Sequence, residues 1–253
     1  MTHESLTAQD APRPLVIVGA GGYGLEVLWV AARITQERAG TGGWNVLGFV
    51  DDRASLRGTM IEGLPVLGSV TDFFESHAEW PVHFHCAVGN NFQRQKLAAV
   101  FEGRGLKPAT LVDPMATVSP RATIAPGAFV APRVYIGPAA RIGRHAILNV
   151  SSSIGHHCSI GDFAQICPGA RVSGHCTIGR LAFLGSNAVV HPGKRVGESA
   201  TVSAASFVVR NVRPNTLVIG VPAVTVQQSL PMAGEVSEAD PTDGNTPPAS
   251  ITE

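Results

Sequence analysis

Three histidines have a spacing that could support chemistry. His156 and His157 are adjacent, and His175 follows His157 by 18 residues. An imidazole titrates near neutral pH and acts as a general base when a nucleophile is brought to it. His156 is therefore either a candidate base or a solvated surface histidine. His157 and His175 could in principle hold zinc with a third histidine from another subunit, but no flanking carboxylate suggests support for such ligands, so we expect no metal site.

A second group of residues is typical of nucleotide binding. Residues 19–24, GAGGYG, match G-x-G-x-x-G between a strand and a helix, where backbone N–H groups can bind phosphate. Asp51 and Asp52 end a second strand pattern, and Gly89 and Asn90 follow a third. Carboxylates at such an edge receive ribose or base donors. The alternative is that these are ordinary turn and cap residues.

The segment that would position this group alternates strand and helix patterns. Helices are expected over residues 23–36, 71–76 and 91–102, between apolar strands, which predicts a small parallel α/β sheet over residues 14–110. With fewer than a hundred residues, this segment has room for only one mononucleotide half, and no hydride-transfer domain follows it. We therefore expect a nucleotide-linked small molecule rather than NAD.

The histidines lie in a segment with a sixfold repeat. An aliphatic residue occurs at every sixth position: Val118, Ile124, Val130, Ile136, Ile142, Leu148, Ile154, Ile160, Ile166, Val172, Ile178, Leu184, Val190, Val196, Val202 and Val208. This period fits a parallel β-helix in which three short strands make a coil of 18 residues, with about five coils over residues 111–226. Small residues four places later fit a narrow interior. Glycine at the first place is expected to relax the backbone that enters each corner.

An 18-residue coil turns the corners into vertical columns. One column contains Pro138, His156, Gly174 and Pro192. Another, which we expect to form a salt-bridge ladder on the solvent face, contains Arg144, Asp162, Arg180 and Glu198. Cys158 and Cys176 are 18 residues apart as well and are expected to be small core residues rather than a disulfide.

Composition limits the remaining function classes. The 253 residues carry a formal net charge of zero without a basic block, which argues against nucleic acid as a partner. There is no apolar run of 18 residues and no signal peptide at the start, so we expect no membrane insertion and a cytoplasmic location. Residues 1–13 and 227–253 are polar and rich in turn formers, and they are expected to be disordered tails.

Together these residues resemble a family. The motifs GAGGYG, FVDD and AVGNN, followed by a left-handed hexapeptide prism with ILNVSSSIGHHCSIG and the final GVPA at residues 220–223, are similar to the bacterial nucleotide-sugar N-acetyltransferases. These include enzymes of the diacetylbacillosamine and perosamine pathways and are related to sialic-acid O-acetyltransferases. The resemblance covers residues 14 to about 226.

The resemblance implies a cytoplasmic homotrimer, acting in cell-surface polysaccharide biosynthesis, with active sites between neighbouring subunits. It implies His156 as the general base, the Gly174 N–H as oxyanion donor, and direct acetyl transfer from acetyl-CoA, a co-substrate, with no permanently bound cofactor. The UDP- or GDP-linked amino sugar would contact Gly21, Gly22, Tyr23, Asp51, Asp52, Gly89 and Asn90. Acetyl-CoA would contact Gln165, Gly174, Gly185, Ser186 and Ala204.

Three departures from the family pattern remain. His157 stands where bacillosamine-type members have a glutamate that raises the basicity of the catalytic histidine, so either an acid from elsewhere serves or His156 is a weaker base. Gln165 replaces a histidine that touches CoA, and Val224 replaces a basic residue. Lys194, Arg195, Arg210 or Arg213 could instead meet the CoA phosphates. The rival functions are a sugar O-acetyltransferase, a zinc hydratase on the same prism and a non-catalytic scaffold.

Overall fold

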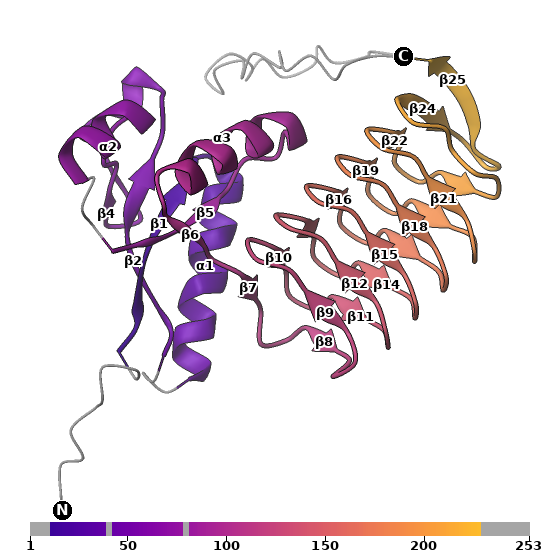
Figure 1. Ribbon diagram of the computed structural model, residues 1–253, viewed down its shortest axis with the longest axis horizontal. Coiled ribbons are helices and arrows are strands. Elements are labelled where there is room, and N and C mark those ends of the chain that lie inside the picture. The colour runs from indigo at the N-terminus through magenta and orange to yellow at the C-terminus, as the bar shows by residue number, and fades with distance from the viewer. Residues whose placement is uncertain (1–10, 39–41, 78–80, 229–253) are drawn as a thin grey trace, which may run out of the picture.

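The computed structural model describes residues 11–38, 42–77 and 81–228, and the chain forms an α/β part followed by a prism of stacked coils (Figure 1). The expected tails lie mostly outside the described residues. Two parts of them are ordered, because Arg13 opens the first strand and residues 227–228 end the last one. Within the described residues, no helix is both long and apolar enough to cross a membrane.

The α/β part contains a four-stranded parallel sheet in the order β2-β1-β5-β6. Its strands are β1 (Arg13–Val18), β2 (Trp44–Val50), β5 (His83–Cys86) and β6 (Lys107–Pro108). Its helices are α1 (Gly22–Glu37), α2 (Val70–His77) and α3 (Asn91–Gly103), each within one residue of the expected bounds. A short 3-10 helix (Ala54–Leu56) and the antiparallel pair β3 (Met60–Ile61) and β4 (Leu64–Pro65) connect β2 to α2.

The prism has three sheets, one for each side of a triangle, and all its pairings but the last are parallel. The first sheet contains β7 (Leu111–Val112), β10 (Phe129–Val130), β13 (Ile147–Leu148), β16 (Gln165–Ile166), β19 (Phe183–Leu184), β22 (Thr201–Val202), β24 (Thr216–Ile219) and β25 (Val224–Gln228). The second contains β8 (Thr117–Val118), β11 (Tyr135–Ile136), β14 (Ser153–Ile154), β17 (Arg171–Val172), β20 (Val189–Val190) and β23 (Phe207–Val208). The third contains β9 (Thr123–Ile124), β12 (Arg141–Ile142), β15 (Ser159–Ile160), β18 (Thr177–Ile178) and β21 (Arg195–Val196).

The sixfold column forms the interior of the prism. Every aliphatic residue of the column is buried except Val118 and Ile124 in the first coil, which are half-buried. Up to the last coil, where Val202 pairs with Val218, parallel strand partners in the prism are 18 residues apart, as in the pairing of Ile136 with Ile154 and of Ile154 with Val172. The repeat therefore has the predicted coil length.

The corner glycines have a different role from the one expected. Gly161 does not have a positive φ, so its backbone is open to other residues. A Cβ on Gly161 would instead lie 2.5 Å from the Arg180 backbone nitrogen of the next coil. Glycine is required here by the close approach of successive coils. The left-handed conformation falls two places later, on residues such as His157 (φ 57°) and His175 (φ 60°).

The three corners of the triangle form three edges along the prism. We call the column Pro138, His156, Gly174 and Pro192 the histidine edge, and the column Arg144, Asp162, Arg180 and Glu198 the docking edge. The third edge contains Val150, Pro168, Ser186 and Ala204. The three edges are separated from one another by the strands of the sheets.

The α/β part packs on the docking edge through polar groups at the start of α3. Arg94 is 1% exposed and donates to the carbonyl oxygens of His145 (3.1 Å) and Phe163 (2.8 Å). The Asn91 side chain donates to the Leu181 carbonyl at 3.0 Å. Burial lowers the pKa of Arg94 to about 10, so the guanidinium remains charged at neutral pH. Helix α3 is thereby fixed to three successive coils.

This docking changes the expected salt-bridge ladder. Arg144 forms an ion pair with Glu102 of α3 at 2.5 Å, and Asp162 accepts the backbone N–H of Arg144 at 2.8 Å. Only Arg180 and Glu198, 2.7 Å apart, form the predicted ion pair between coils. The prediction of a four-residue ladder on a solvent face was wrong, because the helix supplies a nearer carboxylate to Arg144.

Candidate active site

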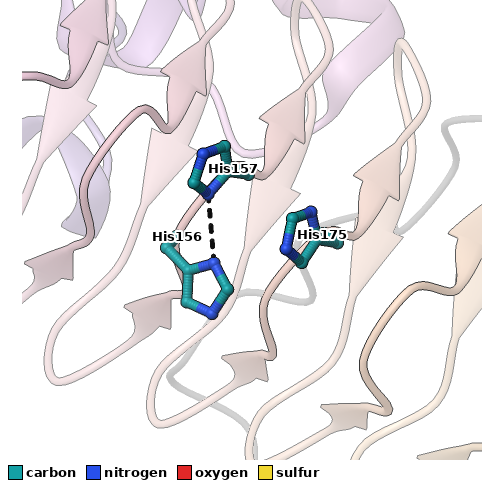
Figure 2. Close-up of side chains that lie close together, drawn as sticks. All are labelled: His156, His157 and His175. Carbon is teal, nitrogen blue, oxygen red and sulfur yellow. Dashed lines mark hydrogen bonds between the residues drawn. The ribbon is translucent and has the colours of Figure 1, made fainter.

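Two neighbouring turns of the histidine edge bring three imidazoles together. His156 and His157 form the turn between β14 and β15, and His175 lies in the next turn along, between β17 and β18 (Figure 2). The backbone N–H of His175 donates to the His156 carbonyl at 2.9 Å, which fixes the distance between the two turns. All three side chains are exposed.

The imidazoles of His156 and His157 are linked directly. Their Nδ1 atoms lie 3.1 Å apart, and their rings are nearly perpendicular at 84°. The His175 ring centroid lies 4.9 Å from that of His156 and 4.9 Å from that of His157, with the latter pair stacked. A hydrogen bond between two Nδ1 atoms needs one donor and one acceptor, so each ring constrains the tautomer of the other.

The other nitrogen of His156 faces Gly174. A Cβ on Gly174 would lie 2.6 Å from His156 Nε2, so a side chain there would displace the ring. In the part of the chain that the structure describes, the Gly174 N–H meets no hydrogen-bond acceptor. The predicted pairing of His156 with Gly174 therefore joins an imidazole nitrogen to an unengaged backbone donor.

The two cysteines beneath this edge point into the prism. Cys158 and Cys176 are both buried and free, and the Cys158 thiol donates to the Ser173 carbonyl. The neighbouring Cys176 thiol and burial both raise the pKa of Cys158. A protonated, inward thiol is a poor nucleophile, in agreement with the expectation that Cys158 has a structural role.

A cavity of about 570 Å³ lies at the carboxyl edge of the small sheet. Gly19, Asp51 and Asp52 line it together with Gln93 and Lys96 of α3. Gly21 is the N-cap residue of α1, and Gly22 is its first residue, with no atom within 4 Å of a Cβ placed there. Space and free helix N–H groups at this point suit a phosphate.

The polar side chains around this cavity also have local structural roles. Asp51 accepts the Ala20 N–H at 2.8 Å and three hydrogen bonds from Arg53, and these bonds outweigh burial and hold the pKa of Asp51 below its usual value. Asp52 accepts the Val70 N–H at 2.9 Å, and Asn90 caps α3. Asp52 and Asn90 are therefore helix-capping residues, as the alternative interpretation of the sequence expected. A ligand could use only the lone pairs that these side chains have left.

A smaller cavity of about 160 Å³ lies between α1 and the prism. Tyr23, Gly89 and Gln165 line it. The Tyr23 hydroxyl and Gln165 Oε1 are buried there without a hydrogen-bond partner among the described residues, and burial raises the pKa of Tyr23. The family resemblance implied that Tyr23 contacts the nucleotide sugar and that Gln165 contacts acetyl-CoA. The structure places both side chains at one cavity.

The remaining residues expected at acetyl-CoA lie away from His156 in the same chain. Gly185 and Ala204 stack on the third edge, where a Cβ on Gly185 would lie 2.5 Å from the Ala204 nitrogen, and Ser186 is beside them. His156 is on the histidine edge. One chain thus brings His156 together with Gly174, but it does not bring this pair to the third edge or to the large cavity at the small sheet.

Sequence reasoning missed several residues that shape these sites. Gln93 and Lys96 line the large cavity, and Arg94 fixes α3 on the prism. A basic residue in the first turns of the helix that follows the Gly89-Asn90 loop is a signal that could have identified Lys96 as a phosphate ligand candidate. Arg94 has no such signal, because the prism carbonyls to which it donates are far away in the sequence.

Comparisons with known proteins agree with this arrangement. The family model described as the PglD N-terminal domain matches residues 14–101, and the model described as bacterial transferase hexapeptide (six repeats) matches residues 157–192. GDP-perosamine N-acetyltransferase from Escherichia coli O157:H7 is 30% identical over 159 residues, which cover 63% of this chain and 69% of that protein. The chain belongs to the nucleotide-sugar N-acetyltransferases of the hexapeptide family.

Solved structures of this family extend the likeness to nearly the whole fold. PerB from Caulobacter crescentus, in complex with CoA and GDP-perosamine, has a TM-score of 0.76 at 30% identity, over 86% of this chain and 99% of that one. The acetyltransferase domain of PglB from Neisseria gonorrhoeae FA1090 has a TM-score of 0.76 at 31% identity, over 85% and 100%. They confirm the expected fold, an α/β domain followed by a left-handed β-helix, and an acetyltransferase that uses acetyl-CoA.

Proposed function

We propose that this N-acetyltransferase acetylates the amine of a nucleotide-linked amino-deoxy sugar by direct transfer within a complex of both substrates, with His156 as general base. The observation that carries the proposal is the 3.1 Å contact between the Nδ1 atoms of His156 and His157, with His156 Nε2 facing Gly174. Because GDP-perosamine is bound by PerB, which aligns over most of the chain, a GDP-linked amino sugar is the first substrate to test.

The chemical step follows from one tautomer of the histidine pair. When His156 Nδ1–H donates to His157 Nδ1, His156 Nε2 has a free lone pair and can accept a proton from the sugar amine. The neutral amine attacks the thioester carbonyl of acetyl-CoA and gives this proton to His156 as the C–N bond forms, while the Gly174 N–H stabilises the negative charge on the carbonyl oxygen. When the C–S bond breaks, the CoA sulfur receives the proton from His156, so amide and CoA thiol form without an acyl-enzyme.

In this mechanism His157 replaces the carboxylate expected beside the base. An imidazole can accept the Nδ1–H hydrogen bond of His156 and so favour the basic tautomer, although it lacks the negative charge that stabilises an imidazolium. His157 is thus a positioning residue, and no acidic helper from the same chain is needed to orient His156.

The assembly that completes the site is also a proposal. His156, on the histidine edge, is separated from Gly185, Ser186 and Ala204, on the third edge, by a side of the prism. We infer a homotrimer in which these two edges of neighbouring prisms face one another and enclose acetyl-CoA. The nucleotide would then bind at the α/β part, with Gly21, Gly22 and Tyr23 at the start of α1 and Asp51, Asp52, Gly89 and Asn90 at the sheet edge.

The test measures acetyl transfer to GDP-perosamine by the wild-type chain and by His156→Asn. Loss of a general base typically costs 10² to 10⁴ in rate, so we expect kcat to fall about 10²-fold or more. Asn retains an N–H group near the position of Nδ1 but has no basic nitrogen. The matched control is His191→Asn, another exposed imidazole of the prism, which should retain wild-type turnover. An unchanged kcat in His156→Asn would contradict the assignment.

A further inference from the structure

The three imidazoles of the histidine edge have the spacing of a metal site. One ring nitrogen from each of His156, His157 and His175 lies within 4.8 Å of the others. Zinc with Zn–N bonds of about 2.0–2.1 Å in tetrahedral geometry requires ligand nitrogens roughly 3.3 Å apart. The 3.1 Å between the two Nδ1 atoms is already close to this value. The His175 ring, which is exposed, lies in the neighbouring turn within the same 4.8 Å limit (Figure 2).

The chemistry of the donors selects the kind of ion. Among the described residues, the group consists of three imidazoles and contains no carboxylate. Imidazole nitrogens bind zinc and its neighbours in the first transition row, whereas magnesium and calcium require oxygen ligands. Three protein ligands leave a fourth tetrahedral position for water or an anion.

We propose that His156, His157 and His175 form a binding site for Zn²⁺, and that the bound ion switches the acetyltransferase off. The inhibition rests on the proposed role of His156 as base, whereas the binding does not. Zinc at this site is an inhibitor and not a cofactor of the transfer.

The inhibition follows from the two nitrogens of one imidazole. A neutral imidazole has one nitrogen with a free lone pair, and the other carries the proton. His156 Nδ1 faces His157, and Nε2 faces Gly174. When Nδ1 gives its lone pair to zinc, Nε2 must carry the proton and cannot accept another one from the sugar amine. The metal-bound and the catalytically competent forms of His156 therefore exclude each other.

The ordered backbone makes this site more than a chance group of surface histidines. The two turns that carry the ligands are held together by the hydrogen bond from the His175 N–H to the His156 carbonyl and by the strand pairing of Ser153 with Arg171. The backbone positions are thus fixed before the ion arrives, and only side-chain rotation is lost on binding.

Binding is tested first, without any substrate. Metal is removed from the untagged full-length chain with EDTA, and the EDTA is then removed. The chain is titrated with Co²⁺ while the visible d–d absorption of the bound ion is recorded. Zn²⁺ is then added as a competitor. We expect one tetrahedral site per chain. Because even loss of an indirect ligand contact costs about 10–100-fold in affinity, His175→Asn should weaken Zn²⁺ binding at least about tenfold. His191→Asn should bind as the wild-type chain does.

Inhibition is tested on the same proteins by counting acetylated sugar directly by chromatography, because the free CoA thiol also binds zinc. Zn²⁺ should inhibit the wild-type chain reversibly, with EDTA restoring turnover. With inhibition expressed relative to the metal-free turnover of each variant, His175→Asn should require at least about tenfold more Zn²⁺ for half-inhibition than the wild-type chain.

Each outcome decides one part of the proposal. Absence of Co²⁺ and Zn²⁺ binding, or equal binding by His175→Asn and the wild-type chain, would overturn the site. Zinc binding without inhibition would overturn the switch. If the metal-free wild-type chain transfers no acetyl group, the proposed function fails, and the metal titration still decides whether the site exists.

Discussion

In the proposed mechanism, the position of the proton between His156 and His157 determines whether His156 can act as a base. A carboxylate can only accept a hydrogen bond at neutral pH, whereas the imidazole of His157 can either accept from His156 Nδ1 or donate to it. Only the first arrangement leaves His156 Nε2 as a base. The pair therefore has an inactive tautomer that a histidine–carboxylate pair lacks, and the same flexibility lets both Nδ1 atoms turn toward a metal ion.

Another histidine makes stability depend on pH. His85 is 2% exposed, its Nδ1 lies 3.0 Å from the Ala109 carbonyl, and burial lowers its pKa to about 4. In the unfolded chain, an ordinary histidine has a pKa of about 6.5. Between these values the unfolded state binds the extra proton, so the contribution of neutral His85 is present above about pH 6.5 and is lost as pH falls toward 4.

We therefore expect His85→Asn to abolish part of the acid sensitivity. Between pH 7 and pH 4, the free energy of unfolding of the wild-type chain should fall by roughly 3 kcal/mol more than that of His85→Asn. Urea unfolding at several pH values measures the difference, and the other titrating groups are common to both chains. Parallel pH profiles for the two chains would mean that His85 is not responsible.

At the scale of elements, the sequence predicted the prism because each strand of two residues must direct its second side chain inward. The sixfold period and the 18-residue columns were enough to place His156 beside Gly174 and His157 beside His175. The sequence did not predict that His156 completes the imidazole group, because ring orientation at a corner is not set by the repeat. It also did not predict the partner of Arg144, since Glu102 belongs to a helix whose docking depends on packing between the two parts.

The corner glycines allow a test of whether the coils need glycine for its backbone freedom or for its lack of a side chain. If glycine serves for conformational freedom, Gly161→Ala should be harmless, because the φ of Gly161 is not positive. The close contact with the Arg180 nitrogen instead predicts that the extra carbon forces the coils apart. Such overpacking typically lowers the free energy of unfolding by about 1–3 kcal/mol.

The matched control for this substitution is Gly103→Ala at the end of α3. No atom lies within 4 Å of a Cβ placed on Gly103. Alanine there should leave the free energy of unfolding unchanged or raise it by about 0.5–1 kcal/mol. Chemical denaturation of both variants measures the effects, and a Gly161→Ala chain as stable as the wild type would refute the close-approach argument.

At the scale of the whole molecule, the α/β part is fixed to an edge of the prism that does not carry His156. Arg94 and Asn91 hold α3 on the docking edge, while His156 lies on the histidine edge. The α/β part could reach its own His156 only by breaking these buried hydrogen bonds between α3 and the prism. We therefore expect a site that contains both nucleotide and base to combine residues from different chains.

If the site is shared between chains, two inactive variants should restore activity to each other in a mixed assembly. Gly22→Glu should fold, because the position is open and an acid near a helix N-terminus is favourable, but its charge should repel the phosphates of the nucleotide sugar. His156→Asn retains the nucleotide site and lacks the base. In trimers that contain both variants, with one such site between each pair of neighbours, about one third of the sites should combine an intact base with an intact nucleotide site.

The experiment co-expresses the two variants with different affinity tags, isolates the mixed assemblies and measures acetyl transfer per chain. Gly22→Gln, which is similar in size but uncharged, should have a KM for the nucleotide sugar closer to that of the wild-type chain, so that the loss in Gly22→Glu can be attributed to charge. Mixed assemblies with no more activity than the separate variants would show that each site is built from a single chain. Such a result would require the α/β part to leave the docking edge during the reaction, since the edge that binds α3 is not the edge that carries His156.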